Sequence, residues 1–496
     1  MAFHAVLLLL YTDSEPCDRS KMRLLNFRTL LSAVLASSTV ASAATPGPGP
    51  LPPPADQELA RSLLREMIES RTTHNVGSTD LAKAIQSHLL RAGFSSEDVT
   101  FIAPVDHPTK GNVVIRYRGK GRGRPVLFLG HLDVVEARRE DWSFDPFKLT
   151  EDGGWFYGRG SIDMKEGDAA LVETLIRLKR EGFRPDRDVI VALTADEEAG
   201  GDANGPAFLL KEHRKLIDAE LAINLDGGGG EYKEGKRLYF SLGTSEKNYV
   251  TFTAETTSPG GHGSLPGPDN AIYSLAAGLV RLSSYKFPVH ITATTRSNLA
   301  QRADLDPSPL SADMRAVSGA TADPAAAERL SNANVRVNAL LRTTCVATLI
   351  SGGHAENALP QRAKATIQCR MMPGESAESV KTALMGALGD PKISLTLDAA
   401  PILSPESPPT SRLLKKAAAV IHSMWPGVAI VPSMATGFSD GRQTRNAGIP
   451  TYDLSGVWAD VDENRAHGQD ERVGVREFDE SVEYTYRLVQ EFSKKD

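Results

Sequence analysis

The chain has 496 residues, which is enough for two or three domains with sizeable hydrophobic cores. Hydrophobic residues make up 41% and charged residues 24%, so collagen-like, coiled-coil and wholly disordered proteins are excluded. The formal charge of −6 leaves no basic excess to hold a nucleic-acid backbone, so we expect no nucleic-acid partner. Three cysteines are too few for a disulfide scaffold or a thiolate-rich zinc fold.

The first 43 residues have the pattern of a signal peptide. Two arginines precede an apolar stretch at residues 29–40, and an A-x-A cleavage sequence ends at Ala43. A shorter apolar run at residues 5–10 lacks a cationic flank, which suggests that Met22 is the true start. A buried N-terminal helix is the alternative, but the segment has no polar residues at helical spacing. We therefore expect an exported protein, periplasmic or secreted.

No internal apolar run approaches the roughly 20 residues that a bilayer-spanning helix needs, so the mature form is expected to have no membrane partner. A Pro/Gly-rich linker is expected at residues 44–55. After it, apolar residues from Leu59 to Ile68 recur at helical spacing, and a second helical pattern runs from Ser78 to Gly93.

Short, almost wholly apolar strands follow the two helices. They cover residues 126–129, 189–193 and 221–225, and a helical pattern at 169–178 lies between the first two. This alternation of apolar strands and helices predicts an α/β fold with a mostly parallel sheet covered on both faces.

The pattern changes after residue 241. Tyr249 to Ala254 alternates apolar and polar residues, a helical pattern covers Ala271 to Leu282, and two strands flank Gly352-Gly353. These features predict a smaller α+β domain inserted in the larger one. The expected boundaries are 56–241 and 374–496 for the two parts of the larger domain and 242–373 for the insertion.

Residues that bind metals or protons follow each of the three apolar strands. His131 and Asp133 follow the first strand, Glu197 and Glu198 follow the second, and Asp226 follows the third. In open α/β sheets, ligands bind where the carboxyl ends of neighbouring strands meet. Each residue alone has an ordinary explanation, such as a helix N-cap or a solvated surface. Taken together, the carboxylates at one rim would repel each other unless a cation lies between them. A set of His and carboxylate side chains without Cys favours Zn²⁺ or a similar ion over Ca²⁺.

Several longer motifs occur in order along the chain. They are Gly130-His131-Leu132-Asp133-Val134-Val135, Gly158-Arg159-Gly160-Ser161-Ile162-Asp163-Met164-Lys165, Asp196-Glu197-Glu198-Ala199-Gly200-Gly201, Gly260-Gly261-His262-Gly263-Ser264-Leu265-Pro266, Asn357-Ala358-Leu359-Pro360 with Arg370, Ser439-Asp440-Gly441-Arg442, and Arg465-Ala466-His467-Gly468-Gln469-Asp470-Glu471. This series resembles the metallopeptidase family of glutamate carboxypeptidase, acetylornithine deacetylase and succinyl-diaminopimelate desuccinylase. The resemblance covers essentially the whole mature chain and looks closest to the carboxypeptidase-S-like branch.

The resemblance implies two zinc ions per chain, for which Co²⁺ or Mn²⁺ is expected to substitute. The implied metal ligands are His131, Asp163, Glu198, Asp226 and His467, with Asp163 bridging both ions. Asp133 would orient the imidazole of His131, and Glu197 would be the general base that takes a proton from the attacking water. The fold implied is a mostly parallel α/β di-zinc catalytic domain with an inserted α+β lid, or dimerisation, domain.

Three lid residues complete the implied site. His262 resembles a histidine that reaches the substrate carbonyl oxygen, typically across a dimer interface. Asn357 and Arg370 resemble residues that bind the terminal carboxylate of the substrate, although a turn residue and a solvated strand residue are the ordinary alternatives.

A homodimer through the lid is therefore expected. One surface of the dimer contact would be the helix at 271–282, unless that helix merely covers the lid's own sheet. The other would be the strand Tyr249–Ala254, if it lies at a sheet edge. Long lid insertions in the resembled family can, however, replace the partner chain.

The cysteines Cys345 and Cys369 lie on the two candidate strands around the turn at 352–360, almost equidistant from it. Two separately buried thiols are the favoured reading, because the sequence cannot give the strand register. A cross-strand disulfide is the alternative in an oxidising compartment.

Three functions remain open from the sequence. The leading one is an exported di-zinc metallopeptidase, an exopeptidase such as a carboxypeptidase or dipeptidase, that hydrolyses amide bonds of small peptides or N-acyl amino acids. The alternative is an N-acyl amino acid deacylase on the same scaffold. A catalytically silent binding protein is least favoured, because every implied metal-ligand position has a suitable residue and the implied general base, Glu197, is present. Asp226 stands where the family's peptidases tend to have Asp and its deacylases Glu, which favours peptide bonds.

Overall fold

A computed structural model describes residues 47–201 and 203–495 of the chain. The predicted signal peptide and the first residues of the predicted linker lie outside these ranges. None of the helices within the described ranges is long and apolar enough to cross a membrane.

The described part of the linker packs against the rest of the protein. Gly49 is buried, and the carbonyl oxygens of Gly47 and Gly49 accept hydrogen bonds from Arg237 and Arg476, respectively. Helix α1 (Pro54–Glu69) begins inside the predicted linker, with Pro at its start, where a missing N–H group costs nothing.

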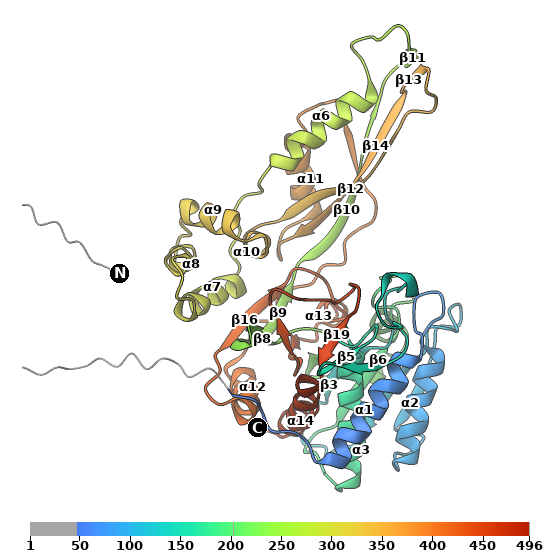
Figure 1. The fold of residues 1–496 in the computed structure, drawn as a ribbon, viewed down its shortest axis with the longest axis vertical. Coiled ribbons are helices and arrows are strands. Elements are labelled where there is room, and N and C mark those ends of the chain that lie inside the picture. Colours follow the sequence, from blue (N-terminus) through green and yellow to red (C-terminus); the bar gives the residue numbers. More distant parts are fainter. Residues whose placement is uncertain (1–46, 202, 496) are drawn as a thin grey trace, which may run out of the picture. The chain divides into compact units, whose positions relative to one another are not determined.

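The larger domain, which we call the main domain, is built on a ten-stranded mixed sheet (Figure 1). Its strand order is β1-β2-β6-β3-β7-β17-β9-β8-β18, and β16 also pairs with β9. The neighbours β6, β3, β7 and β17 run parallel, whereas β2 is antiparallel to β6 and β17 is antiparallel to β9. The strands are β1 (Val99–Ile102), β2 (Asn112–Tyr117), β3 (Val126–His131), β6 (Val189–Thr194), β7 (Leu221–Asn224), β8 (Gly229–Lys233), β9 (Lys236–Glu246), β16 (Ile430–Ala435), β17 (Thr451–Asp453) and β18 (Trp458–Asp460).

Helices cover both faces of this sheet, because its central strands are apolar on both sides. In β3, Val126 and Phe128 join one hydrophobic core, and Leu127 and Leu129 join another. The helices of the main domain besides α1 are α2 (Thr79–Arg91), α3 (Lys165–Arg180), α4 (Gly205–Glu212), α5 (Arg214–Ile217), α12 (Ser411–Met424), α13 (Gly441–Asn446) and α14 (Val475–Phe492), with a short 3-10 helix at Arg139–Asp141. A small sheet of β4 (Thr150–Asp152), β5 (Trp155–Tyr157) and β19 (Arg472–Gly474) completes it. The predicted α/β fold and its three apolar strands are confirmed.

The lid contains a separate four-stranded antiparallel sheet in the order β12-β14-β10-β15. Its strands are β10 (Asn248–Thr257), β12 (Thr344–Gly352), β14 (Arg362–Met371) and β15 (Ser394–Leu397). Helices α6 (Ala271–Ser284) and α11 (Ala377–Leu388) share one hydrophobic core with this sheet. A two-stranded ribbon, β11 (Gly261–His262) with β13 (Ala358–Leu359), lies at the end of the lid remote from β3 and β6 (Figure 1).

The structure bears on two statements about the lid: the dimer surface offered by the strand Tyr249–Ala254 depended on an edge position, and the lid was expected to end at residue 373. Strand β10 is not at an edge, because it pairs with β14 on one side and with β15 on the other. The lid also does not end at residue 373, because α11 and β15 pack and pair with its sheet. A strand followed by a helix and another strand gives the same sequence pattern in an antiparallel α+β sheet as in a parallel one. The sequence therefore did not show that β15 pairs with the lid sheet.

Four helices in the lid form a cluster that the sequence reading did not separate from the rest. They are α7 (Ala293–Leu305), α8 (Leu310–Ser318), α9 (Pro324–Ala333) and α10 (Val335–Leu341), and they enclose a hydrophobic core of their own. The side chain of Asn298 in α7 donates to the carbonyl oxygen of Pro432, which attaches the cluster to β16.

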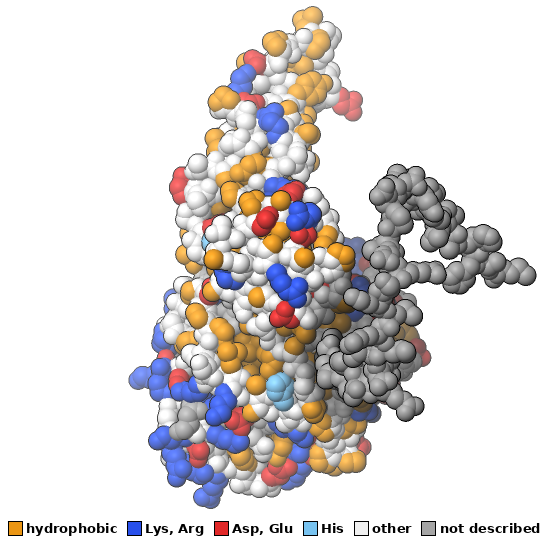
Figure 2. Space-filling model, turned by 90° about the vertical axis from the view of Figure 1, so that its left-hand side faces the viewer, with side chains coloured by type: hydrophobic (Ala, Val, Ile, Leu, Met, Phe, Trp, Pro, Cys, Tyr) orange, Lys and Arg blue, Asp and Glu red, His pale blue; other side chains and the backbone are white. Residues whose placement is uncertain are grey.

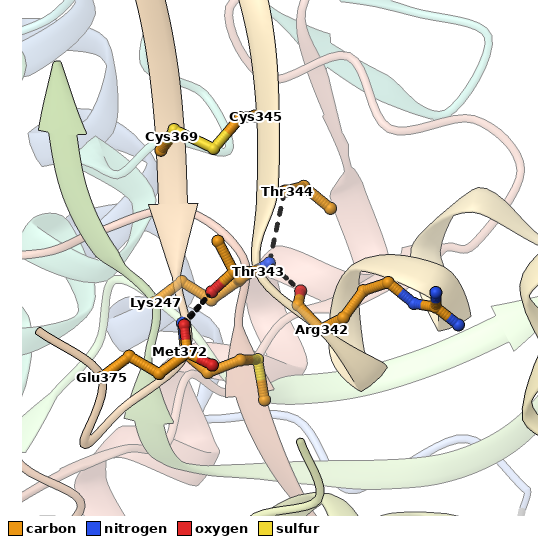
Figure 3. The surroundings of a disulfide bond; sticks show 8 residues. All are labelled: Lys247, Arg342, Thr343, Thr344, Cys345, Cys369, Met372 and Glu375. Carbon is orange, nitrogen blue, oxygen red and sulfur yellow. Dashed lines mark hydrogen bonds between the residues drawn. A yellow bond between two sulfur atoms is a disulfide. The ribbon is translucent and has the colours of Figure 1, made fainter. Parts of the chain in front are cut away.

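Cys345 and Cys369 form a disulfide between β12 and β14 (Figure 3). They are direct partners in the strand register, with their Cα atoms 4.1 Å apart. The favoured reading of two separate thiols is therefore wrong, because the register places the two side chains opposite each other.

Candidate metal centre

Three neighbouring parallel strands carry the candidate ligands at their carboxyl ends. In the order β6-β3-β7, the segment Glu197–Glu198 follows β6, His131 ends β3, and Asp226 lies just beyond β7. Parallel neighbours end at the same edge of a sheet, so these side chains meet at one rim.

Two groups of candidate ligands share Asp163. His131, Asp163 and Asp226 form one group, and Asp163, Glu198 and His467 form the other; within each group the ligand atoms lie within 4.8 Å of one another. The two oxygens of Asp163 face different rings: Oδ1 is 3.2 Å from His131 Nε2, and Oδ2 is 3.2 Å from His467 Nε2. The structure thus brings together all five residues predicted as ligands.

Loops before α3 and β19 supply the remaining two residues of this set. Asp163 precedes α3, and His467 lies in the turn before β19 with a left-handed backbone, φ 62°. Non-glycine residues seldom adopt this conformation, and it recurs where a side chain must be aimed at a site. His467 Nε2 is 3.0 Å from a carboxylate oxygen of Glu198.

The electrostatics of the rim fit bound cations. Burial raises the pKa of the Asp226 carboxyl well above its usual range, and nearby carboxylates add to this. Hydrogen bonds to Asp163 and Glu198 raise the pKa of His467 to about 10. Burial opposes charge on His131, yet the surrounding carboxylates still raise its pKa well above the usual value. Such a set holds excess negative charge, and two imidazoles with carboxylates and no thiolate suit first-row divalent ions.

Asp133 holds the backbone that carries the ligands of the neighbouring strand. Its carboxylate accepts hydrogen bonds from the backbone N–H groups of Glu197 and Glu198, each at 3.1 Å. His131 Nδ1 lies 3.0 Å from the carbonyl oxygen of Asp133 and 3.7 Å from its carboxylate. The ring of His131 is therefore oriented mainly by the backbone of Asp133.

Glu197 is buried beside the two groups but belongs to neither. Burial raises the pKa of its carboxyl well above the usual range, with further contributions from Asp440 and Glu198. The residue before it, Asp196, has φ 63° and is also buried. The position suits a group that exchanges protons next to the metals without binding them.

Asp196 is held by two residues that the sequence reading missed. Lys110 Nζ and His74 Nδ1 lie 2.5 Å and 2.9 Å from Asp196 Oδ1. Asp440 was part of a quoted motif but had no assigned role; it accepts hydrogen bonds from Thr194 at 2.8 Å and Asn204 at 2.7 Å beneath the same loop. A basic residue just before a buried strand was the only sequence signal for Lys110.

The structure separates the predicted lid residues. His262 and Asn357 are neighbours in the β11–β13 ribbon, where Gly263 N–H donates to the Asn357 carbonyl at 2.7 Å. Arg370 lies near the opposite end of β14, whose ten residues span roughly 30 Å. Asn357 and Arg370 of one chain therefore cannot bind the same carboxylate, and no contact joins His262 to the metal groups within the described ranges.

The ring of His262 is set to donate a hydrogen bond. Backbone N–H of Ser264 donates to His262 Nδ1 at 3.2 Å, and Ser264 Oγ lies 2.7 Å from the same nitrogen. In the neutral ring the proton is then on Nε2, which is exposed. That tautomer suits an oxyanion donor.

Comparisons with known proteins agree with the fold and the motifs. The model of the peptidase family M20/M25/M40 matches residues 127–491. The chain is 27% identical to human N-fatty-acyl-amino acid synthase/hydrolase PM20D1 over 376 residues, 74% of each chain. It is also 27% identical to probable carboxypeptidase S-like 2 of Dictyostelium discoideum over 404 residues, 77% of this chain and 75% of the relative.

A solved structure shows the same fold. The M20 family metallo-carboxypeptidase Sso-CP2 of Sulfolobus solfataricus superposes with a TM-score of 0.63 at 16% identity, covering 88% of this chain and 99% of that one. The resemblance found in the motifs is thereby confirmed.

Proposed function

Since this chain belongs to the peptidase family M20/M25/M40 and is a metal-dependent hydrolase, we propose that it is an exported di-zinc exopeptidase that cleaves amide bonds of small peptides or N-acyl amino acids. The observation that carries the proposal is the pair of ligand groups that share Asp163. A carboxylate with one oxygen on each side is the donor that two adjacent ions require.

Five of the site residues are proposed as metal ligands. His131 and Asp226 would hold one ion, Glu198 and His467 would hold the other, and Asp163 would offer one carboxylate oxygen to each group. Two bound ions would supply acidification of a water molecule and polarisation of the scissile carbonyl.

Glu197 takes the proton of the attacking water and passes it to the departing amine. Asp133 keeps Glu197 and Glu198 in place through their backbone N–H groups. The buried position of Glu197 beside both ligand groups, and outside them, supports this role.

We further propose that His262 and Asn357 contact the substrate bound at the metal centre of a second copy of the chain. The β11–β13 ribbon that carries them lies remote from β3 and β6 (Figure 1). The lid sheet has two edge strands, β12 and β15. Of these we assign β12 to the contact with a second copy, because it exposes Val346, Leu349 and Ile350 by 56%, 68% and 64% and pairs with β14 alone among the described strands.

Helix α6 adds apolar surface next to this edge. Leu275 is buried against the lid's own sheet, whereas Tyr273 and Val280 on the same helix are exposed by 74% and 68%. Figure 2 shows hydrophobic side chains on the surface of the narrow upper part, which is the lid in Figure 1. Exposed apolar residues on a helix and on a free strand edge favour self-association through the lid.

Export is supported by the signal-peptide pattern and by the disulfide, since disulfides persist in oxidising compartments. Mass spectrometry of protein from its host should show a mature N-terminus near Ala44. An intact Met1 or Met22 in the cytosolic fraction would refute export.

The relatives favour two related substrate classes. One is named as a synthase/hydrolase of N-fatty-acyl-amino acids, and another as a probable carboxypeptidase. The deciding experiment is a substrate panel on zinc-loaded protein, with dipeptides compared with N-acyl amino acids of short and long acyl chains. Faster hydrolysis of dipeptides supports the exopeptidase, faster hydrolysis of N-acyl amino acids supports the deacylase, and hydrolysis of neither class refutes the proposal.

A further inference from the structure

The chain crosses between the main domain and the lid twice. It leaves the main domain at Glu246, the last residue of β9, and it returns through the segment between β15 and α12, residues 398–410. Two hydrogen bonds join the crossings: Ser404 donates its backbone N–H to Asn248 Oδ1 at 2.6 Å and its hydroxyl to Glu246 Oε1 at 2.7 Å. All three side chains are buried, and we call Glu246, Asn248 and Ser404 the base of the lid.

Glu246 is also bonded to the main domain next to the metal rim. Its Oε2 accepts two hydrogen bonds from Ser439, from the backbone N–H at 2.8 Å and from the hydroxyl at 3.1 Å. The Ser439 hydroxyl accepts in turn from Asn224 Nδ2 at 3.2 Å, and Asn224 Oδ1 accepts from the backbone N–H of the proposed metal ligand Asp226 at 3.3 Å. Three buried side chains, Glu246, Ser439 and Asn224, thus connect the base of the lid to the metal centre, and we call them the relay.

A second branch joins the two ends of the relay. Arg445, in α13, contacts Glu246 Oε1 at 3.1 Å and Asp453 at 3.3 Å. Asp453, at the end of β17, accepts a hydrogen bond from Asn224 Nδ2 at 3.2 Å. Asn224 is therefore the residue where both branches meet, two positions before Asp226.

The relay has little room to change its partners. A Cβ atom on Gly243, in β9, would lie 2.3 Å from Asp453 Oδ2, and one on Gly227, next to Asp226, would lie 3.2 Å from the Cβ of Asp453. Separating any bonded pair would leave a buried polar group without a partner, which is costly. The members of the relay are therefore expected to move together.

We propose that Glu246 is a positioning residue for the metal centre, which acts through Ser439 and Asn224 to tie the place of Asp226 to the attachment of the lid. This inference rests on the proposed function and assigns a regulation to the same site. Zinc binding at Asp226 and order at the base of the lid then stabilise each other, because a coupling between two sites acts in both directions. The lid thereby contributes to the metal centre without touching the metals.

The first test is zinc affinity, measured by competition with a chromophoric chelator. Ser439→Ala removes the hydroxyl in the middle of the relay and adds no bulk, and Glu246→Gln keeps the shape of the side chain at the base of the lid. We expect each variant to bind one of its two zinc ions about 10- to 100-fold more weakly and the other normally, which is the usual effect of losing a partner that supports a metal ligand. Wild-type affinity for both ions in both variants would overturn the proposal.

The matched control is Glu480→Gln. Glu480, in α14, is a fully buried carboxylate that accepts hydrogen bonds from Arg237, Trp425 and Arg476, all of which lie outside the metal groups. The control should be less stable to urea but keep both zinc affinities. An equal loss of zinc affinity in Glu480→Gln would show that Glu246→Gln acts by general destabilisation, and would overturn the proposal.

A double-mutant cycle tests whether Glu246 and Ser439 act along one route. In Glu246→Gln combined with Ser439→Ala, the loss of zinc affinity should be clearly smaller than the product of the two single losses, because each variant interrupts the same relay. A loss equal to that product would show two independent effects and would refute the relay.

Hydrogen exchange tests the coupling in the opposite direction and needs no substrate. Zinc should slow exchange of the Ser404 amide in the wild type by about 5- to 150-fold, the usual range for coupled sites, and should leave α11 of the lid unchanged. Ser439→Ala should abolish this protection. A wild type without the protection, or equal protection in Ser439→Ala, would overturn the proposal.

These outcomes are separable from those of the proposed function. A wild type that binds two zinc ions but hydrolyses no substrate of the panel would refute the hydrolase, and zinc affinity and hydrogen exchange would still decide on the relay. Hydrolysis with unchanged zinc affinity in Ser439→Ala and Glu246→Gln would refute the relay alone. A wild type that binds no zinc would refute both.

Discussion

The ammonium group of Lys110 lies 2.5 Å from the carboxylate of Asp196, and both side chains are buried. Lys110 also donates to the carbonyl oxygen of His74 at 2.8 Å. These contacts hold Asp196 in its left-handed conformation immediately before Glu197. The position of the proposed general base thus depends on a lysine 86 residues away in the sequence.

Lys110→Met should lower kcat by on the order of 10²-fold, because a displacement of about 1 Å of a catalytic group has an effect of that size. KM and zinc content should change little. Steady-state kinetics and elemental analysis check this, with Lys83→Met on the exposed side of α2 as the control. A normal kcat with Met at position 110 would show that Asp196 does not position Glu197.

Reconstituted protein should contain close to two zinc ions per chain, because two ligand groups share Asp163. His467→Ala removes a ligand of one group and should reduce the content toward one ion. Elemental analysis after removal of loosely bound metal measures both, and the exposed His107→Ala is the control. One ion or none in folded wild-type protein would contradict a dinuclear site.

Glu197→Gln should retain metal and fold but lose about 10²–10⁴ in kcat, the range for a lost general base. The amide keeps the shape of the side chain but cannot take up the proton. Turnover assays together with metal analysis give the answer, with the exposed Glu151→Gln as the control. Near-normal turnover would assign proton transfer to another group.

Mixed dimers should show whether His262 serves the metal centre of its own chain or that of a second chain. If His262 serves the metals of a second chain, co-expressed Glu197→Gln and His262→Ala chains should recover activity, because one of the two composite sites is intact. Activity of the purified heterodimer is compared with each variant alone. Full activity of a monomer would instead show that His262 acts within its own chain or not at all.

Glu173 in α3 should make the protein less stable as the pH rises. Burial raises the pKa of its carboxyl to about 8, the neighbours Asp56 and Glu483 add to this, and Arg177 and Arg180 oppose it. The folded state therefore keeps a proton that the unfolded state releases between roughly pH 4.5 and 8. The free energy of unfolding should fall over this range by up to about 1.4 kcal/mol per pH unit.

Glu173→Gln cannot ionise and should remove that part of the pH dependence. Urea unfolding from pH 5 to 8 measures it, with the exposed Glu69→Gln as the control. Parallel stability curves for wild type and Glu173→Gln would mean that the carboxyl is ionised in the folded protein.

Local sequence patterns were sufficient for three of the five proposed metal ligands, which are His131, Glu198 and Asp226. The strands at 126–129, 189–193 and 221–225 are apolar enough to be recognised, and parallel pairing brings their ends together. These three ligands sit at or just beyond such an end. Asp163 and His467 lie in loops before α3 and β19, and only the resemblance of the longer motifs pointed to them.

Features that depend on pairing between distant segments were not accessible in the same way. The position of β10 inside the lid sheet and the pairing of Cys345 with Cys369 depend on strand register, which alternating residues do not specify. Lys110 meets Asp196 only through the tertiary fold, and an isolated basic residue in a sequence usually indicates a solvated surface.

The insertion of the lid has a consequence for the order in which the protein can be made. All four strands of the lid sheet lie between Asn248 and Leu397 and can pair as soon as that stretch of chain is complete. The main sheet must wait for β17, which fills the gap between β7 and β9. His467 is synthesised later still, so a nascent chain completes its lid before its metal centre, and the second ion can be captured only by a nearly finished polypeptide.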